Sequence, residues 1–234
     1  MNKRRNKQSR PGIDFLLAAL TLAPALANWL GLWILNDAWL AIILCCLIFY
    51  GGAYWVIRAF RLRSMLAIRP RNILKSLGWG VLSALGAAAL ILALGILFFT
   101  RAISGNMLQI CSERLAHSQA LRYSFWQFFL FVGIIVPVGE ELYWRAGLQG
   151  LLRLRFSRTK TVLFSALLFT FYHLVTVGFL IPGVPGLPLV ALVFISGLVL
   201  AWLTQHTKNI WAAAICHGLG GWGAIIFMVW KYLR

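Results

Sequence analysis

Acidic side chains are scarce in this chain of 234 residues, which has five of them against 22 lysines and arginines. Charged residues make up 12% of the sequence, roughly half the share that is usual in soluble domains. Its four cysteines show neither the spacing of a disulfide framework nor that of a zinc ribbon. Apolar runs such as ALGAAALILALGILFF do not alternate as the strands of a membrane β-barrel do. These absences argue against a soluble domain, a disulfide scaffold and a barrel.

Hydrophobic residues make up 61% of the chain, and apolar runs of about 20 residues, long enough to cross a bilayer as helices, recur along it. A helix satisfies every backbone polar group within its own segment, as the hydrocarbon core requires. The sequence therefore predicts an all-α, polytopic helical membrane protein with about seven transmembrane helices. We expect these spans at residues 12–35, 38–59, 77–99, 123–152, 162–181, 187–206 and 209–230.

The basic residues are distributed as membrane topology would place them. With the N-terminus in the cytoplasm, most of the 22 lie in the cytoplasmic segments at residues 3–10, 58–75, 153–160 and 208, and few on the opposite side. This positive-inside bias, and not binding to nucleic acid, explains the net charge of +17, and the bilayer is the expected partner. The first apolar run loosely resembles a signal peptide, but it continues past Ala27, so we expect an uncleaved span. Short loops favour a bacterial plasma membrane.

The stretch VPVGEELYWRAG, residues 136–147, places Glu140, Glu141 and Arg145 within an apolar span. Glu141 and Arg145 are four residues apart, so they share a helix face and can form an ion pair. Glu140 is rotated by about 100° from Glu141 and should point elsewhere, without Arg145 as its partner. The pair has a structural explanation, whereas Glu140 indicates a functional carboxylate.

Two further ionisable side chains, His173 and His217, lie in apolar spans at a depth similar to that of Glu140. A buried carboxylate can serve as a general base, and a histidine near the same water can orient it. A second histidine could donate to a developing oxyanion. Together they would suit the attack of an activated water on a carbonyl group.

Three other chemistries use similar residues. Glu140, His173 and His217 are ordinary zinc ligands, although the HExxH spacing is absent. A proton-coupled transporter also uses buried Glu and His, but no inverted repeat is visible. An intramembrane serine protease could use Ser165 or Ser196, but GxSxG is missing.

These residues resemble the motifs of the CPBP family, the CAAX-protease and bacteriocin-processing intramembrane endopeptidases. EELYWR is similar to its EExxxR motif, FTFYH (169–173) to FxxxH, and HGLGG (217–221) to a histidine followed four positions later by Asn or Asp. The resemblance covers roughly residues 123–230 and implies a glutamate mechanism without a cofactor, with zinc as an open alternative. It implies Glu140 as the base, His173 as its assistant and His217 as an oxyanion donor.

In the same resemblance, Glu141 and Arg145 would support the site, and Phe169 would pack in it. Gly221 departs from the family pattern, so one oxyanion donor is missing or lies elsewhere; Asn209 is too near the start of its helix to replace it.

The sequence thus predicts two parts: residues 1–122, an N-terminal tail with three spans, and residues 123–234, a CPBP-like catalytic helical core. The predicted function is an intramembrane endopeptidase that cleaves a membrane-associated protein or peptide. The alternative is a non-catalytic family member that acts as a bacteriocin-immunity or regulatory membrane protein.

Overall fold

The computed structural model describes residues 11–66, 70–97 and 105–232, and the residues it describes form helices and short connections without strands. Within these ranges seven helices are long and apolar enough to cross a membrane: Asp14–Ile34, Ala38–Ala59, Ile73–Leu97, Phe125–Arg155, Arg158–Leu180, Val184–Thr207 and Trp211–Tyr232. The predicted fold class is therefore confirmed, and each observed span overlaps its predicted one. The basic residues at 3–10, Arg69, Arg101 and Arg234, which contributed to the predicted orientation, lie outside the described residues.

The elements follow one another with short connections. In chain order they are α1 (Pro11–Trp29), η1 (Leu30–Ile34), α2 (Ala38–Ala59), η2 (Arg63–Met65), α3 (Pro70–Leu97), α4 (Gly105–His117), α5 (Phe125–Phe128), η4 (Phe129–Ile135), α6 (Val136–Glu140), η5 (Glu141–Leu148), α7 (Gln149–Arg155), α8 (Arg158–Leu180), η6 (Val184–Gly186), α9 (Leu187–Thr207), α10 (Trp211–Ile215), η7 (Cys216–Trp222) and α11 (Gly223–Tyr232). The short helix α4 lies between the third and fourth spans. Helix α3 begins at Pro70 and not near residue 77, because proline is tolerated in the first turn of a helix.

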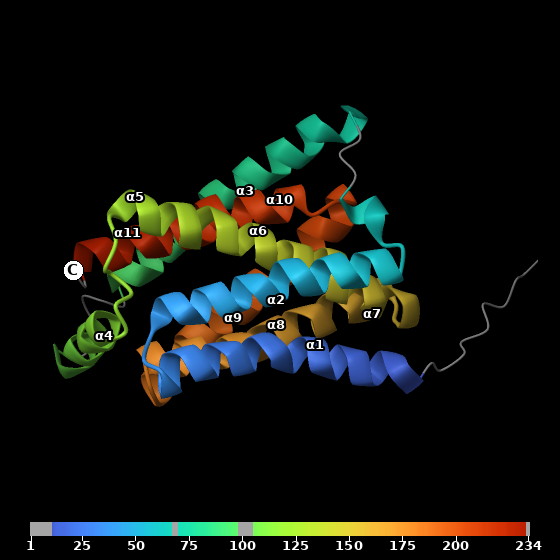
Figure 1. The fold of residues 1–234 in the computed structure, drawn as a ribbon. Coiled ribbons are helices and arrows are strands. Elements are labelled where there is room, and N and C mark those ends of the chain that lie inside the picture. Colours follow the sequence, from blue (N-terminus) through green and yellow to red (C-terminus); the bar gives the residue numbers. More distant parts are fainter. Residues whose placement is uncertain (1–10, 67–69, 98–104, 233–234) are drawn as a thin grey trace, which may run out of the picture.

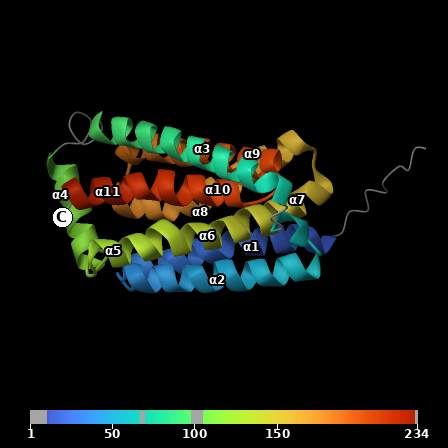
Figure 2. The ribbon, with the colours of Figure 1, turned by 90° about the horizontal axis from the view of Figure 1, so that it is seen from above.

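The seven spans lie side by side along one direction, and α4 lies across one end of the bundle (Figure 1). Helix α3 forms one edge, where it packs on α10, η7 and α11. Helices α1 and α2 form the opposite side, as Figure 2 shows, and α2 packs on α6 and η5. The helix that carries the EELYWR motif and the helix that carries HGLGG thus lie between α3 on one side and α1 and α2 on the other.

Polar residues at the helix ends fix where several spans begin. The Asp37 side chain accepts a hydrogen bond from the Leu40 amide at 2.9 Å and caps α2. Ser124 and Gln127 form a capping box at the start of α5. Asn209 accepts a hydrogen bond from the Trp211 amide at 3.1 Å at the start of α10. Asn209 therefore lies at one end of the bundle, as its position in the sequence predicted.

Several spans contain π-helical turns, and two of these carry motif residues: η5 holds Glu141 and Arg145, and η7 holds His217. Such turns widen the helix locally and are frequent at functional sites. Upstream of η5, Pro137 has no amide hydrogen, so it cannot form the usual helical hydrogen bond to the Gly133 carbonyl. A regular helix pattern could not have predicted these departures.

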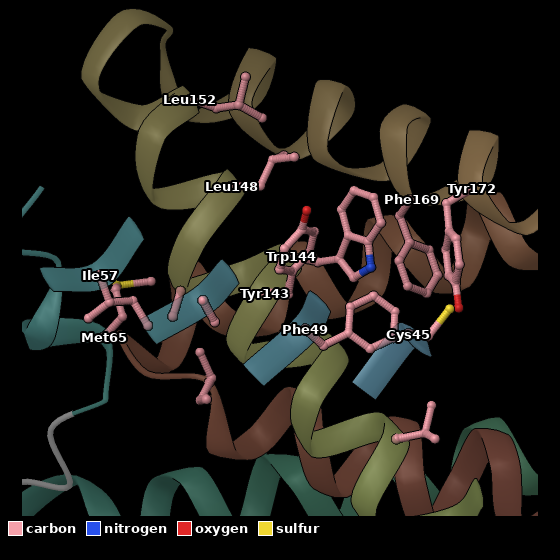
Figure 3. Packing of buried hydrophobic residues seen from close by; sticks show 14 of the residues in the cluster. Cys45, Phe49, Ile57, Met65, Tyr143, Trp144, Leu148, Leu152, Phe169 and Tyr172 are labelled. Atoms are coloured by element: carbon pink, nitrogen blue, oxygen red, sulfur yellow. The ribbon is translucent and has the colours of Figure 1, made fainter. Parts of the chain in front are cut away.

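The core beside α2 is built from large aromatic side chains, which we call the aromatic wall: Phe49, Tyr143, Trp144, Phe169 and Tyr172. Figure 3 shows them grouped around Trp144, with Phe49 contributed by α2 and Phe169 and Tyr172 by α8. The Trp144 ring lies 5.6 Å from that of Tyr172 and 5.9 Å from that of Phe169, measured between centroids. The Tyr143 hydroxyl donates to the Leu20 carbonyl at 2.5 Å and so joins α1 to this core.

Candidate active site

The two adjacent glutamates and His217 form one buried cluster. The His217 ring lies between the carboxylates: its Nδ1 is 3.0 Å from Glu141 Oε1, and its Nε2 is 3.3 Å from Glu140 Oε2. Both glutamate side chains are fully buried. Residues 77 positions apart in the sequence, on η7 and at the junction of α6 with η5, therefore meet inside the bundle, as their similar predicted depth suggested.

Glu141 also forms the predicted ion pair with Arg145, whose Nε lies 3.0 Å from Glu141 Oε2. A second nitrogen of Arg145 donates to the Ser165 hydroxyl on α8 at 2.8 Å. The guanidinium group lies over the Phe169 ring, 4.9 Å from its centroid. Ser165, weighed above as a nucleophile, is thus a hydrogen-bond partner of this arginine. Because Glu141 is held by Arg145 on one oxygen, its other oxygen is positioned to orient the His217 ring.

Glu140 has different partners from those of Glu141. Its Oε1 accepts a hydrogen bond from the Tyr172 hydroxyl at 3.0 Å. Its Oε2 forms no hydrogen bond within the described part of the chain, although His217 Nε2 faces it. The prediction that Glu140 turns away from Arg145 is confirmed by these contacts. The two carboxylates still share one neighbour, because the two nitrogens of the His217 ring reach both of them.

His173 lies at the edge of this cluster. Its Nδ1 is 2.9 Å from the Phe169 carbonyl oxygen, which can only accept, so Nδ1 carries the hydrogen and Nε2 is left as an acceptor. The Phe169 ring separates the two histidines, with centroid distances of 4.3 Å to His173 and 5.8 Å to His217. In the ranges that the structure covers, no hydrogen bond or ion pair joins His173 to Glu140. His217 thus contacts the carboxylates directly, whereas the Phe169 ring lies between His217 and His173.

Glycines of the HGLGG segment set how closely η7 approaches its neighbours. A Cβ at Gly218 would lie 2.6 Å from the Gly133 carbonyl oxygen, and one at Gly220 would lie 2.6 Å from the Ala84 backbone. Side chains at these two positions would force the helices apart, so we call them the glycine contacts. Gly221 differs, because a Cβ there would meet the His217 ring at an ordinary 3.7 Å. Position 221 therefore has room for a side chain beside His217, where the family pattern has Asn or Asp.

Two tyrosines lie near Glu140 that no sequence motif indicated. Tyr172 hydrogen-bonds the carboxylate, and the ring of Tyr50 on α2 covers Gly139, where an added Cβ would lie 2.7 Å from it. The Tyr50 hydroxyl donates to the Ile135 carbonyl at 2.7 Å. The one available signal was that Tyr172 precedes His173 within an apolar span. Tyr50 lies in a helix with no motif, so nothing in its surroundings indicated the contact.

The structure also bears on where a metal could be held. Among the described residues, no group of three or more His, Cys, Asp or Glu side chains is placed to hold a metal ion. Glu140 and His217 face each other, but His173 does not join them as a third ligand. The zinc alternative stays a prediction, and it would require His173 to move toward the carboxylate.

Fold and site together define a polytopic helical membrane protein with a buried glutamate–histidine cluster contributed by its fourth, fifth and seventh spans. Residues 122–222 match the family model of the Rce1-like type II CAAX prenyl endopeptidases. This match confirms the resemblance to the CPBP family, over somewhat less than half of the chain. Neither a curated protein nor a solved structure matches the chain.

Proposed function

We propose that this protein is an intramembrane endopeptidase that hydrolyses a peptide bond of a membrane-associated protein or peptide, with Glu140 as the base that activates water. One observation carries the proposal. Glu140 is fully buried in the segment that matches a protease family, and its Oε2, which faces a histidine, accepts no hydrogen bond from any residue that the structure describes. A purely structural carboxylate at such a depth would be expected to have both oxygens satisfied, as those of Glu141 are.

The reaction would proceed by general base catalysis. Glu140 Oε2 would take a proton from a water as its oxygen attacks the peptide carbonyl, which gives a tetrahedral intermediate with a negatively charged oxygen. The same proton would then pass to the amide nitrogen, and the C–N bond would break to give an acid and an amine. His173, with Nε2 as an acceptor, would help to orient the water. With a hydrogen on each ring nitrogen, His217 would donate from Nδ1 to Glu141 Oε1 and from Nε2 to the oxyanion.

The surrounding residues would keep His217 ready for that role. Glu141 Oε1 can accept the Nδ1 hydrogen of His217, and Arg145 fixes Glu141 from the other side. Phe169 separates the two histidines and supports the Arg145 guanidinium group. Because Glu140 is fully buried, a substrate can reach it only after side chains around it move. We therefore expect substrate binding to open the cluster, and not to fit a preformed cleft.

The proposal is tested by comparing the termini of membrane proteins in cells that make the wild-type chain or Glu140→Gln. We expect uncleaved tails to accumulate with Glu140→Gln. The cleavage rate should fall by a factor of about 100 or more, because general base catalysis contributes that much. Glu113→Gln, a change on the exposed face of α4, is the matched control and should leave cleavage intact.

The same assay separates the alternatives. Equal cleavage by wild type and by a correctly folded Glu140→Gln protein would contradict the proposal and favour a non-catalytic role. Loss of cleavage by purified protein with a chelator, and its recovery with zinc, would replace the glutamate mechanism by a metal-dependent one.

A further inference from the structure

A groove of about 630 Å³ lies on the outside of the bundle, away from the glutamate–histidine cluster. Its lining comes from α2, the η2 region and η5, and includes Tyr50, Tyr54, Arg58, Arg63, Leu66 and Leu142. The α2 residues recur at positions 50, 53, 54, 57 and 58, which is one face of a helix. This face extends about 12 Å from Tyr50 to Arg58. The groove is thus a long apolar surface that ends at two arginines.

The groove does not open onto Glu140. Tyr50 closes its inner end, because its ring packs on Gly139 and its hydroxyl is bonded to the Ile135 carbonyl. Glu140, the next residue after Gly139, is fully buried. An occupant of the groove would therefore not touch the carboxylate in this structure, so the groove needs an explanation other than the reacting peptide bond.

Within residues 11–66, 70–97 and 105–232, the two arginines at its outer end form no ion pair with an acidic side chain. Asp14 pairs with Arg155, Asp37 caps α2 at the opposite end of the bundle, and Glu113 accepts a hydrogen bond from Gln109. The other two acidic residues are buried in the cluster. In the part of the chain that the structure describes, Arg58 and Arg63 are thus not neutralised by a carboxylate side chain.

Arg58 is held over the groove by its neighbour one turn earlier. It donates to the Tyr54 hydroxyl at 3.0 Å, and its guanidinium carbon lies 5.9 Å from the centre of the Tyr54 ring. Both side chains are exposed. Arg58 is also the second-last residue of a membrane span, so it lies where lipid headgroups meet the hydrocarbon. Its position favours an anion that is attached to an apolar chain.

We propose that this groove binds one anionic phospholipid of the bilayer, with its phosphate on Arg58 and Arg63 and an acyl chain along Tyr54 toward Tyr50. The charge of the two arginines selects an anionic headgroup, and basic pockets between transmembrane helices commonly bind such lipids. The apolar lining fits an acyl chain, and the volume lies in the range of ordinary ligand pockets. The site is independent of the proposed peptidase activity.

Native mass spectrometry of the purified full chain in detergent tests this site with dioleoylphosphatidylglycerol and dioleoylphosphatidylcholine as probes. We expect one phosphatidylglycerol to be retained in preference to phosphatidylcholine. The double change Arg58→Gln with Arg63→Gln should weaken its retention roughly tenfold or more, since each basic residue contributes to anionic lipid binding. Arg58→Lys with Arg63→Lys should keep most of the binding, which shows that a loss reflects charge and not misfolding.

The matched control is Arg61→Gln with Lys75→Gln, which removes the same charge at the same end of the bundle from two exposed residues that do not line the groove. This control should retain the lipid. Equal retention of both lipids, equal loss in the two double variants, or unchanged binding in Arg58→Gln/Arg63→Gln would overturn the proposal. Displacement by glycerol phosphate, which lacks acyl chains, would assign the arginines to a soluble anion and would also overturn it.

Discussion

Glu140 lies against large side chains, whereas His217 lies where the backbones of neighbouring helices come close. On the first side, Tyr172, one of the rings of the aromatic wall, provides a hydroxyl to Glu140. On the second side, the glycine contacts at Gly218 and Gly220 bring η7 against Gly133 and Ala84. Glu140 is therefore positioned by a large side chain, and His217, which faces it, by the absence of side chains at two glycines.

This difference has a physical basis in the membrane. Lipid tails are as apolar as the helix surfaces, so close packing and hydrogen bonds hold transmembrane helices together. Large rings fill the space between α2, η5 and α8, and a lost ring leaves a cavity. Glycines let the backbones approach, and an added methyl group pushes them apart. The aromatic wall should be sensitive to truncation, and the glycine contacts to enlargement.

The largest expected effect is that of Trp144→Ala, which removes the fully buried ring at the centre of the aromatic wall. We expect a loss of about 3–5 kcal/mol in the free energy of unfolding, because the truncation of a buried Trp leaves a large cavity. Thermal unfolding of the purified protein in detergent measures it. Trp126→Ala is the control, since the Trp126 side chain is 74% exposed and should tolerate the change. Equal midpoints for the two variants would contradict this view of the aromatic wall.

A smaller but still clear effect is expected from Gly220→Ala. Its Cβ would lie 2.6 Å from Ala84 backbone atoms, which cannot move without shifting α3. We expect a destabilisation of about 1–3 kcal/mol, the usual cost of overpacking a core. The neighbouring Gly221→Ala is the matched control, because its Cβ would meet only ordinary contacts.

Thermal unfolding of both proteins compares these two glycines. We expect Gly221→Ala to be neutral or slightly stabilising, since alanine restricts the unfolded chain more than glycine does. If both changes cost the same, the close approach of η7 to α3 at Gly220 does not contribute specifically to the stability of the bundle.

The sequence predicted these helices well, because each span is recognised from its own composition and length. It also predicted the pair of Glu141 and Arg145, since four residues bring two side chains to one face of any helix. These predictions succeed because they depend on neighbours in the chain. The roles assigned to Glu140, His173 and His217 stay predictions, as their chemistry has to be measured.

Contacts between distant spans could not be predicted in the same way. The contact of Tyr172 with Glu140 and that of Tyr50 with Gly139 depend on how the helices are rotated about their axes. Hydrophobic periodicity does not determine this rotation. The position of His217 between both glutamates also depends on the π-helical turns of η5 and η7, whose local register departs from 3.6 residues per turn. Similar depth indicated that His217 and Glu140 could meet, but only the packed structure shows which nitrogen faces which carboxylate.

The smallest change in the aromatic wall is the removal of one hydroxyl. It distinguishes an effect on stability from an effect on the proposed reaction. Tyr172→Phe takes the donor from Glu140 Oε1 and leaves the ring in place, so we expect a loss of about 1–3 kcal/mol in stability, since a buried acceptor becomes unsatisfied. Tyr143→Phe is the control. It removes the hydroxyl of another ring in the aromatic wall, and this hydroxyl donates to the Leu20 carbonyl and not to a carboxylate. Both variants should therefore lower the unfolding midpoint, but only Tyr172→Phe should also slow cleavage of a substrate identified from the uncleaved tails. Equal cleavage rates for the two variants would show that the Tyr172 hydroxyl holds Glu140 only for packing, because a donor that positions the base has to affect the reaction as well as the fold.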